Sequence, residues 1–323
     1  MSVSEISSKL LSYFKYMDIS VIICTHNPKT EFLRRTLEAI RIQTLNKDRW
    51  EFILIDNASR KLLSESWDLS WHPGARHVRE DQLGLTAARL RGIEESKADV
   101  LIFVDDDNVL DPDYLENALA IAVKWQILGA WGGRIDPEFE TPAPAWTAPC
   151  LSMLAIRPVT QELWSNDPNH GSTHPWGAGM CVRKEVAVVF SRNITNDPIR
   201  KNLGRIGTGL GSCEDVDLVL TCPEIGLGFG LFPRLRLLHL IPSGRLDEDY
   251  LMRLCEGLTA SGTVLRAVRG LEAPPSLPSL GRRLINFIKF LRMGRIERRL
   301  WRAKQNGYQT ARDIIGEHRG ERP

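Results

Sequence analysis

Hydrophobic runs alternate with amphipathic segments over the first 125 residues of the chain. Apolar runs of strand length occur at residues 19–24, 51–55 and 99–104. Apolar residues recur every three or four positions in segment 31–43, where one stripe contains Phe32, Leu33, Leu37 and Ile40. The polar run 75–81 and two further segments of helical period, 85–96 and 112–125, continue the alternation. This order predicts an α/β protein with βαβ units and a parallel, doubly wound sheet.

The pattern changes after residue 136. Segment 136–175 is rich in Pro, Trp, Asn and Thr, and we expect long loops there rather than regular structure. A short strand at 179–182, a Gly-rich stretch at 203–212 and a helix at 214–226 are predicted to follow. From about Asp247 the tail is helical in period, and a proline cluster interrupts it at Pro274, Pro275 and Pro278.

The composition is that of a globular protein, with 43% hydrophobic and 25% charged residues among 323. A formal net charge of +2 argues against a disordered chain and against a dedicated nucleic-acid binder, so no nucleic-acid partner is expected. The six cysteines form no CxxC pair, which favours reduced thiols over disulfides or a zinc site. No signal peptide and no long apolar window is visible, and we expect a cytoplasmic protein that is soluble or peripheral to the inner face of the membrane.

Three predicted strands end in polar or acidic residues. The first ends at CTHN (24–27), the second at DNAS (56–59) and a later one at DDD (105–107). Ligands of open α/β sheets bind beyond the carboxyl ends of the strands. We therefore expect these three groups to face one crevice.

The acidic triplet Asp105, Asp106 and Asp107 has two explanations. Acids after a strand commonly cap the next helix or form turns. Three adjacent carboxylates also repel one another, and a divalent cation removes that repulsion whereas a helix cap does not. Mg²⁺ and Mn²⁺ take oxygen ligands and keep sites for water and substrate phosphate. The triplet therefore indicates a site for a metal and a diphosphate.

Six blocks in order, from about Asp18 to His239, resemble glycosyltransferase family 2, the inverting nucleotide-sugar glycosyltransferases with the GT-A fold. The blocks are ISVIICTHN, WEFILIDNAS, GLTAARLRGIEESKADVLIFVDDDN, WGAGMCVRKE, GSCEDVDL and LLHLIPSGR. The regions implied are an N-terminal extension (1–17), a GT-A catalytic domain (18–245) with a nucleotide-sugar half (18–135) and an acceptor half (136–245), and a helical C-terminal region (246–323).

The resemblance also implies an activity. It is the metal-dependent, inverting transfer of a hexosyl group from a nucleotide-diphosphate sugar to a glycan, lipid-linked or small-molecule acceptor. Such a reaction would serve the synthesis of a surface polysaccharide or another glycoconjugate.

On the donor side, the resemblance implies that Thr25, His26 and Asp56 hold the nucleotide base, with Asp56 accepting from a base N–H. A simple turn after a strand is the alternative for residues 56–59. Arg89 either faces the diphosphate or lies solvated on a helix. The further donor-binding residues implied are Asn27, Asn57, Ser59, Gly84, Asp105 and Asp106.

The divalent cation, Mn²⁺ or Mg²⁺, is expected on Asp107, with Asp105 and His239 as further ligands. Asp105 and Asp106 would otherwise serve the ribose or the water ligands of the ion. His239 stands where many GT-A enzymes supply a ligand, although a lone histidine after apolar residues is often packed instead.

Glu214 and Asp215 match the Glu-Asp pair of the family. Asp215 would remove the proton from the acceptor hydroxyl, and Glu214 would orient the acceptor. Acids at a helix N-terminus are also good caps. Trp176, Gly177 and Gly179 would form the acceptor side, with a buried core tryptophan as the alternative for Trp176.

Two positions depart from the family pattern. Cys24-Thr25-His26 lacks the usual proline and aromatic residue, and Leu90 replaces a frequent asparagine. Two rival functions are a sugar-1-phosphate nucleotidyltransferase and a non-catalytic sugar-nucleotide-binding relative. The first expects a Gly-rich phosphate loop, which CTHNPKTEF does not provide; the second expects loss of the base or of the metal acids, and both are present.

Segment 281–302 is rich in Lys and Arg interspersed with Leu, Ile and Phe. This pattern is typical of an amphipathic helix on an anionic membrane surface, and we expect peripheral membrane contact as one explanation. The other is a C-terminal helix packed on the catalytic domain, with a solvated basic face.

Overall fold

The computed structural model describes residues 17–273 and 279–319. Residues 1–16 of the predicted N-terminal extension and the proline cluster within 274–278 lie outside the described residues. The strands are β1 (Ile19–Thr25), β2 (Trp50–Asn57), β3 (Ala75–Glu80), β4 (Val100–Val104), β5 (Asn108–Leu110), β6 (Leu128–Phe139), β7 (Leu163–Ser165), β8 (Met180–Arg183) and β9 (Gly228–Ile241). The helices are α2 (Thr30–Arg41), α3 (Leu85–Glu95), α4 (Tyr114–Lys124), α5 (Lys184–Thr195), α6 (Pro198–Lys201), α7 (Glu214–Val219), α8 (Thr221–Glu224), α9 (Glu248–Val268), α10 (Leu280–Arg292) and α11 (Arg295–Arg319).

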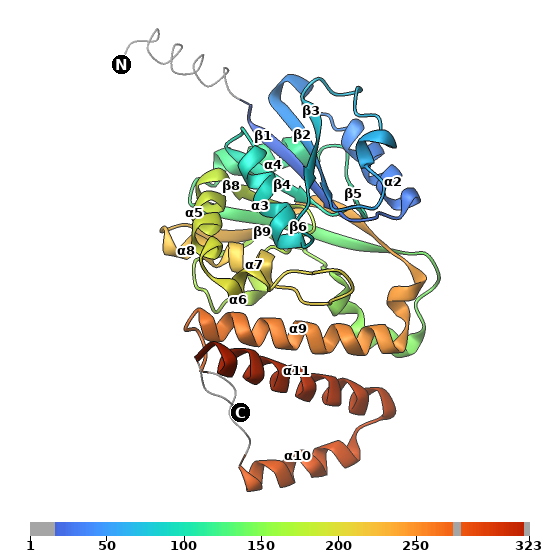
Figure 1. The fold of residues 1–323 in the computed structure, drawn as a ribbon, viewed down its shortest axis with the longest axis vertical. Coiled ribbons are helices and arrows are strands. Elements are labelled where there is room, and N and C mark those ends of the chain that lie inside the picture. Colours follow the sequence, from blue (N-terminus) through green and yellow to red (C-terminus); the bar gives the residue numbers. More distant parts are fainter. Residues whose placement is uncertain (1–16, 274–278, 320–323) are drawn as a thin grey trace.

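All of these strands belong to a single sheet with the order β3-β2-β1-β4-β8-β6-β9-β5, and β7 pairs with β9 (Figure 1). Strands β1 to β4 are mutually parallel along their shared edges, and β6 is parallel to β9. Strands β8, β5 and β7 are antiparallel to their neighbours. The predicted α/β class, with a largely parallel sheet flanked by helices and a helical C-terminal region, is confirmed.

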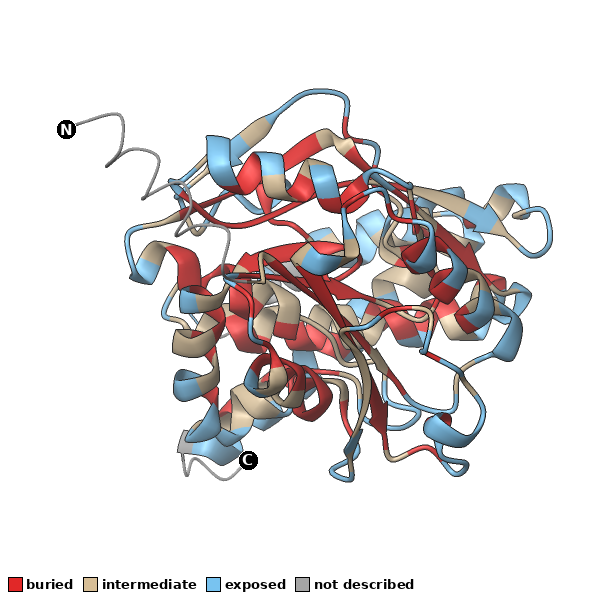
Figure 2. Ribbon diagram, turned by 90° about the horizontal axis from the view of Figure 1, so that it is seen from above, coloured by how far each residue is buried: buried red, intermediate tan, exposed pale blue. Residues whose placement is uncertain are grey.

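The sheet is buried on both faces, which explains why its strands are continuous apolar runs (Figure 2). On β1, Ile23 belongs to the cluster that includes Leu37 of α2. The adjacent Ile22 belongs to the opposite cluster, with Ala88 of α3 and Phe190 of α5. Alternate side chains of a strand point to opposite faces, so one apolar run supplies two cores. Each fully buried Ile or Phe contributes about 1.5–3 kcal/mol to folding.

The expectation of loops throughout 136–175 is wrong in part. Strand β6 continues through Pro137 to Phe139, a 3₁₀-helix spans Ala145–Leu154, and strand β7 lies at Leu163–Ser165. Pro137 is tolerated because β8 pairs with β6 only at Ala130 and Trp131, so no neighbour on that side needs the N–H that proline lacks.

The C-terminal helices form a layer beneath the sheet domain (Figure 1). The side chain of Asp247 caps α9 by accepting from the N–H groups of Asp249 and Tyr250. Helix α9 packs against the domain through Leu251 and Leu254, and against α11 through contacts that include Ala303. None of the described helices is long and apolar enough to cross a membrane.

Two buried histidines predict a loss of stability in mild acid. His72 and His174 are 2% and 5% exposed, and burial lowers the pKa of each to about 4. Such a histidine has a pKa near 6.5 in the unfolded chain and near 4 in the folded protein. Its contribution to the free energy of unfolding is therefore fully present above about pH 6.5. That contribution is lost as pH falls, at up to about 1.4 kcal/mol per pH unit per histidine.

Urea unfolding at about pH 7 and pH 5 measures this loss, and His72→Asn should reduce the pH dependence. His170→Asn, at an exposed histidine, is the matched control and should leave it unchanged. An identical pH dependence in His72→Asn would contradict the prediction.

Candidate active site

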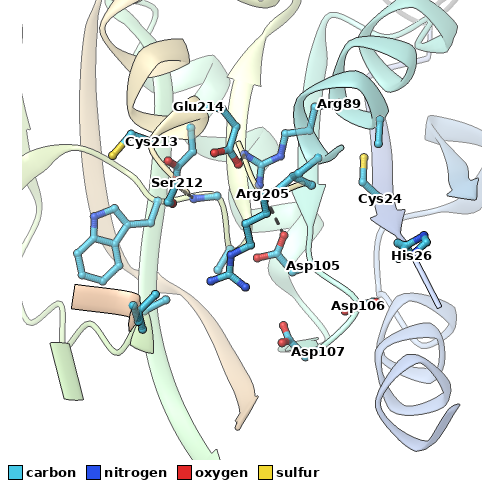
Figure 3. A pocket seen from close by; sticks show the side chains of 18 of the residues that line it. Cys24, His26, Arg89, Asp105, Asp106, Asp107, Arg205, Ser212, Cys213 and Glu214 are labelled. Carbon is cyan, nitrogen blue, oxygen red and sulfur yellow. Dashed lines mark hydrogen bonds and ion pairs between the residues drawn. The ribbon is translucent and has the colours of Figure 1, made fainter. Parts of the chain in front are cut away.

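A cavity of about 450 Å³ lies where the carboxyl ends of the parallel strands meet (Figure 3). The predicted convergence of three strand ends is observed. Thr25 ends β1, Asn57 ends β2, and the acidic triplet comes directly after β4. The N-terminal end of α7 closes the opposite side with Glu214 and Asp215.

Most of the predicted site residues line this cavity. They are Thr25, His26, Asn57, Gly84, Arg89, Asp105, Asp106, Asp107, Trp176, Gly177, Glu214, Asp215 and His239. Four others, Asn27, Asp56, Ser59 and Gly179, do not line it.

Asp56 is engaged by its own turn. Its carboxylate, 4% exposed as a residue, accepts from the N–H groups of Ser59 at 3.0 Å and Leu63 at 3.1 Å, and pairs with Arg79 at 2.9 Å. Burial acts to raise the pKa of Asp56, but these hydrogen bonds hold it below its usual value. Ser59 in turn accepts from the N–H of Asn27, so Asp56 and Ser59 hold together the loops that follow β1 and β2.

Asn57 and His26 connect the same loops to the cavity wall. The amide of Asn57 donates to the carbonyl of Gln82 at 2.8 Å and accepts from the N–H of Gly84 at 2.9 Å. Nδ1 of His26 lies 2.7 Å from the carbonyl oxygen of Asn57. The loop before α3 is therefore held against β2 by one side chain.

The three acids of the triplet have three different environments. Burial and the neighbouring charge of Asp107 raise the pKa of Asp106 to about 7, and its carboxylate accepts from the hydroxyl of Thr25. Burial also raises the pKa of Asp105, against the charge of Arg89 at 3.6 Å. Burial acts in the same direction on Asp107, but the charges of His239 and Arg245 lower its pKa well below the usual range. Asp107 is thus the carboxylate held in its charged form.

Asp107 and His239 converge across the antiparallel pair of β5 and β9. Oδ2 of Asp107 lies 3.5 Å from Nε2 of His239, a separation that two ligands of one ion can have. The guanidinium of Arg245 lies 3.0 Å from the same carboxylate oxygen and 2.9 Å from Nε2 of His239. In the described part of the chain, no three His, Cys, Asp or Glu residues converge closely enough to hold a metal without help. The pair fits a divalent ion that also takes donor phosphate oxygens and water.

Arg89 is buried, at 4% exposure, and the alternative that it is solvated on its helix is therefore wrong. Nη1 donates to Glu214 at 2.9 Å, and Nη2 lies 3.6 Å from Asp105. Burial, opposed by the charge of Arg89, raises the pKa of Glu214 to about 7. The arginine thus links the acids of α7 to the acidic triplet (Figure 3).

Asp215 is held at the start of α7. Oδ2 accepts from the N–H of Gly177 at 2.7 Å, and Oδ1 accepts from the N–H of Val216 at 2.8 Å. Cys213 precedes the helix with φ +93°, a left-handed conformation that is unusual for a residue with a side chain. This turn brings both acids to the cavity wall.

One wall of the cavity is apolar. Trp176 is half-buried and its ring lies under the guanidinium of Arg157, 4.3 Å from the ring centroid. It lines the cavity rather than filling the core, although it packs against one of the core clusters. Met153 from the 3₁₀-helix, and Leu254 and Leu258 from α9, complete the wall.

Sequence reasoning missed two arginines of the cavity and the contribution of α9 to its wall. Arg205 comes from the Gly-rich stretch and extends into the cavity toward Asp105 and Asp107 (Figure 3). Among the described residues it has no ion-pair partner within 4.0 Å. Arg245 closes the block LLHLIPSGR, so a cation six residues after His239 was a readable signal. No local signal marked Tyr250, Leu254 and Leu258 of α9, because only tertiary packing brings them to the cavity.

Gly177 predicts a substitution that damages the site without removing any functional group. A Cβ at this position would lie 2.4 Å from Nη2 of Arg89, so Gly177→Ala should displace the guanidinium from Glu214 and Asp105. We expect kcat/KM to fall at least about tenfold, since misplacing site groups by about 1 Å is costly.

Gly171→Ala is the matched control, because its Cβ would meet only one atom, at 4.0 Å. Steady-state kinetics on both variants tests the prediction. Wild-type kcat/KM in Gly177→Ala would contradict a role for the position of Arg89.

Comparison with known sequences gives one family. The model of the family described as "Glycosyl transferase family 2" matches residues 20–186, more than half of the chain. This range begins in β1 and ends in α5, and it contains the acidic triplet and Trp176.

Three curated relatives carry glycosyltransferase names. The putative glycosyltransferase EpsH of Bacillus subtilis (strain 168) is 28% identical over 107 residues, 32% of this chain and 30% of that protein. Glycosyltransferase AglE of Haloferax volcanii is 30% identical over 105 residues, 32% of this chain and 34% of that protein. A glucosyl-dolichyl phosphate glucuronosyltransferase of the same organism is 25% identical over 145 residues, 42% and 45% of the two chains. The matched segments span less than half the length of each relative.

Among solved structures, that of S. aureus TarS residues 1–349 is similar with a TM-score of 0.49 and 14% identity. The similarity covers 95% of this chain and 92% of that one.

Proposed function

Because the chain belongs to glycosyl transferase family 2 and has an α/β fold with a largely parallel sheet, we propose that it is an inverting glycosyltransferase of the GT-A type. It would transfer a hexosyl group from a nucleotide-diphosphate sugar to an acceptor hydroxyl, in the synthesis of a surface polysaccharide or another glycoconjugate. The proposed domain organisation is a nucleotide-sugar half at 18–135, an acceptor half at 136–245 and a helical region at 246–323.

One observation carries the proposal: a carboxylate on an apolar wall and a cluster of acids and arginines face each other across one cavity. Asp215 accepts from the N–H of Gly177, the neighbour of Trp176 in the chain, and Asp107, Arg205 and Arg245 line the same cavity. Displacement at a sugar carbon needs this arrangement, because the base and the departing diphosphate act on opposite sides of the reacting atom.

On the acceptor side, Asp215 would accept the proton of the attacking hydroxyl. A sugar hydroxyl is a poor nucleophile until its proton is removed, and a positioned carboxylate contributes about 10²–10⁴-fold to such a step. The two N–H groups that bind Asp215 fix its orientation, and apolar residues line the same cavity. Glu214, bound to Arg89, would hold the loop and the acceptor in place. The acceptor proposed is a glycan, a lipid-linked sugar or a small molecule.

On the donor side, Thr25, His26 and the turn fixed by Asp56 would receive the nucleotide. Asp107 and His239 would hold Mn²⁺ or Mg²⁺, which supplies Lewis-acid stabilisation of the charge on the departing diphosphate. Arg205 would pair with the same diphosphate, since it reaches the cavity without a carboxylate partner of its own in the described residues. No covalent intermediate is required, so no Ser or Cys nucleophile is assigned.

Incubation of the protein and Mn²⁺ with a panel of nucleotide sugars and candidate glycan, lipid-linked and small-molecule acceptors tests the proposal, and a parallel incubation contains nucleoside triphosphates and sugar phosphates. Donor-dependent release of a nucleoside diphosphate is expected. A nucleotidyltransferase would instead release pyrophosphate from a nucleoside triphosphate and a sugar phosphate, and a non-catalytic relative would bind the nucleotide sugar without turnover. Either result would overturn the proposed reaction.

Arg245 predicts a change in metal affinity that is independent of turnover. Its guanidinium lies between the two proposed ligands, so Arg245→Met should strengthen binding of Mn²⁺ to the nucleotide-free protein by at least about tenfold. Electron paramagnetic resonance of free Mn²⁺ measures the affinity. Arg236→Met, at an exposed arginine of β9, is the control. Weaker Mn²⁺ binding in Arg245→Met would contradict competition between the guanidinium and the ion.

A further inference from the structure

Helix α10 exposes an apolar face that the proposed reaction does not use. Ile285, Phe287, Ile288 and Leu291 are 49%, 58%, 45% and 56% exposed. Phe287, Ile288 and Leu291 follow the spacing of one helical face. Four large apolar side chains this exposed on one helix of 13 residues exceed the scattered apolar exposure of ordinary surfaces.

The helix stands apart from the catalytic domain, with α11 between it and α9 (Figure 1). Its attachment runs through the end that meets α11. The ring of Phe290 packs on Trp301, with ring centroids 5.2 Å apart, and Arg298 donates to the carbonyls of Phe290 and Leu291. These contacts fix the end of α10 and leave its apolar face open. The expectation of packing on the catalytic domain therefore holds for α11, which contacts α9, and is wrong for α10.

The charge of α10 has one sign. Its sequence, LGRRLINFIKFLR, contains four Lys or Arg residues and no acid. Lys289 and Arg292 are exposed, as are their neighbours Ile288 and Leu291. An apolar face flanked by cations is complementary to an anionic lipid surface, where acyl chains receive the apolar groups and headgroups receive the charges.

We propose that α10 binds in the plane of an anionic lipid membrane and holds the enzyme at that surface. A 13-residue helix is about 20 Å long, which is too short to cross the hydrocarbon core but suited to lie within its interface. Pairing of α10 with a second copy of itself is disfavoured, because the two helices would bring their cations together.

Co-sedimentation of the full chain with vesicles tests the proposal, without any nucleotide sugar present. Binding is expected to vesicles of phosphatidylcholine containing phosphatidylglycerol, and not to phosphatidylcholine alone. Lys289→Gln combined with Arg292→Gln should weaken binding about 25-fold, because each charge removed weakens it about fivefold. Phe287→Ser combined with Leu291→Ser should weaken it at least about tenfold.

Val123→Ser is the matched control, because Val123 is 67% exposed on α4, far from α10 in Figure 1, and it should bind as the wild type does. Wild-type binding by both α10 double variants would overturn the proposal. So would a dimer in light scattering that becomes monomeric in Phe287→Ser with Leu291→Ser, because a second copy would then cover the face. The readout is lipid binding, so its failure leaves the proposed glycosyl transfer intact and is distinguishable from failure of that reaction.

Discussion

Replacing Asp215 by Asn is expected to lower kcat about a thousandfold while changing KM for the donor by less than about twofold. The amide keeps the size of the side chain and can still accept from one of the two N–H groups of Gly177 and Val216. It cannot accept a proton from the acceptor, so only the proton transfer is lost. Initial rates of nucleoside diphosphate release at saturating acceptor measure the effect.

Asp81→Asn provides the control, because the side chain of Asp81 is 85% exposed at the surface. It should keep wild-type kcat. A kcat in Asp215→Asn within tenfold of the wild type would contradict the assignment of Asp215 as the base.

Replacing Asp107 by Ala is expected to lower kcat/KM at least about a thousandfold and to abolish measurable binding of Mn²⁺. The change removes the carboxylate that His239 and Arg245 hold in its charged form, and it leaves Arg245 without that counter-ion. Electron paramagnetic resonance of free Mn²⁺ and steady-state kinetics measure the two effects.

Asp113→Ala is the matched control. Asp113 is an exposed aspartate six residues after Asp107, and its side chain makes no cap hydrogen bond with α4. Asp105→Asn and Asp106→Asn should retain Mn²⁺ binding better than Asp107→Ala does, since their carboxylates face Arg89 and Thr25 instead. Equal loss of Mn²⁺ binding in all three variants would contradict a special role for Asp107.

Local pattern was sufficient for the first four strands of the sheet and for the place of the site. Strand β1 and helix α2 follow from apolar periodicity, because burial on two faces of a sheet or on one stripe of a helix leaves a readable pattern. The acids at 105–107 stand at a strand end, so their position at the crevice also follows from the sequence.

The side-chain partners within the site could not be predicted in the same way. Asp56 lies at a strand end as Asp105 does, yet its carboxylate accepts hydrogen bonds from N–H groups of its own turn. The sequence of α3 leaves open whether Arg89 is solvated, but its guanidinium is buried in a pair with Glu214, which lies 125 residues further along the chain. Such pairings depend on tertiary contacts between segments distant in the chain, and a linear pattern does not encode them.

The configuration of the product tests the central claim of direct displacement most directly. In the proposed reaction, the acceptor oxygen attacks opposite the diphosphate, with Asp215 as base, and the anomeric centre inverts once. Proton NMR of the anomeric hydrogen, recorded during turnover with any donor that the protein accepts, distinguishes the two anomers. A product with the configuration opposite to that of the donor is predicted, and a product that retains the donor configuration would contradict the account.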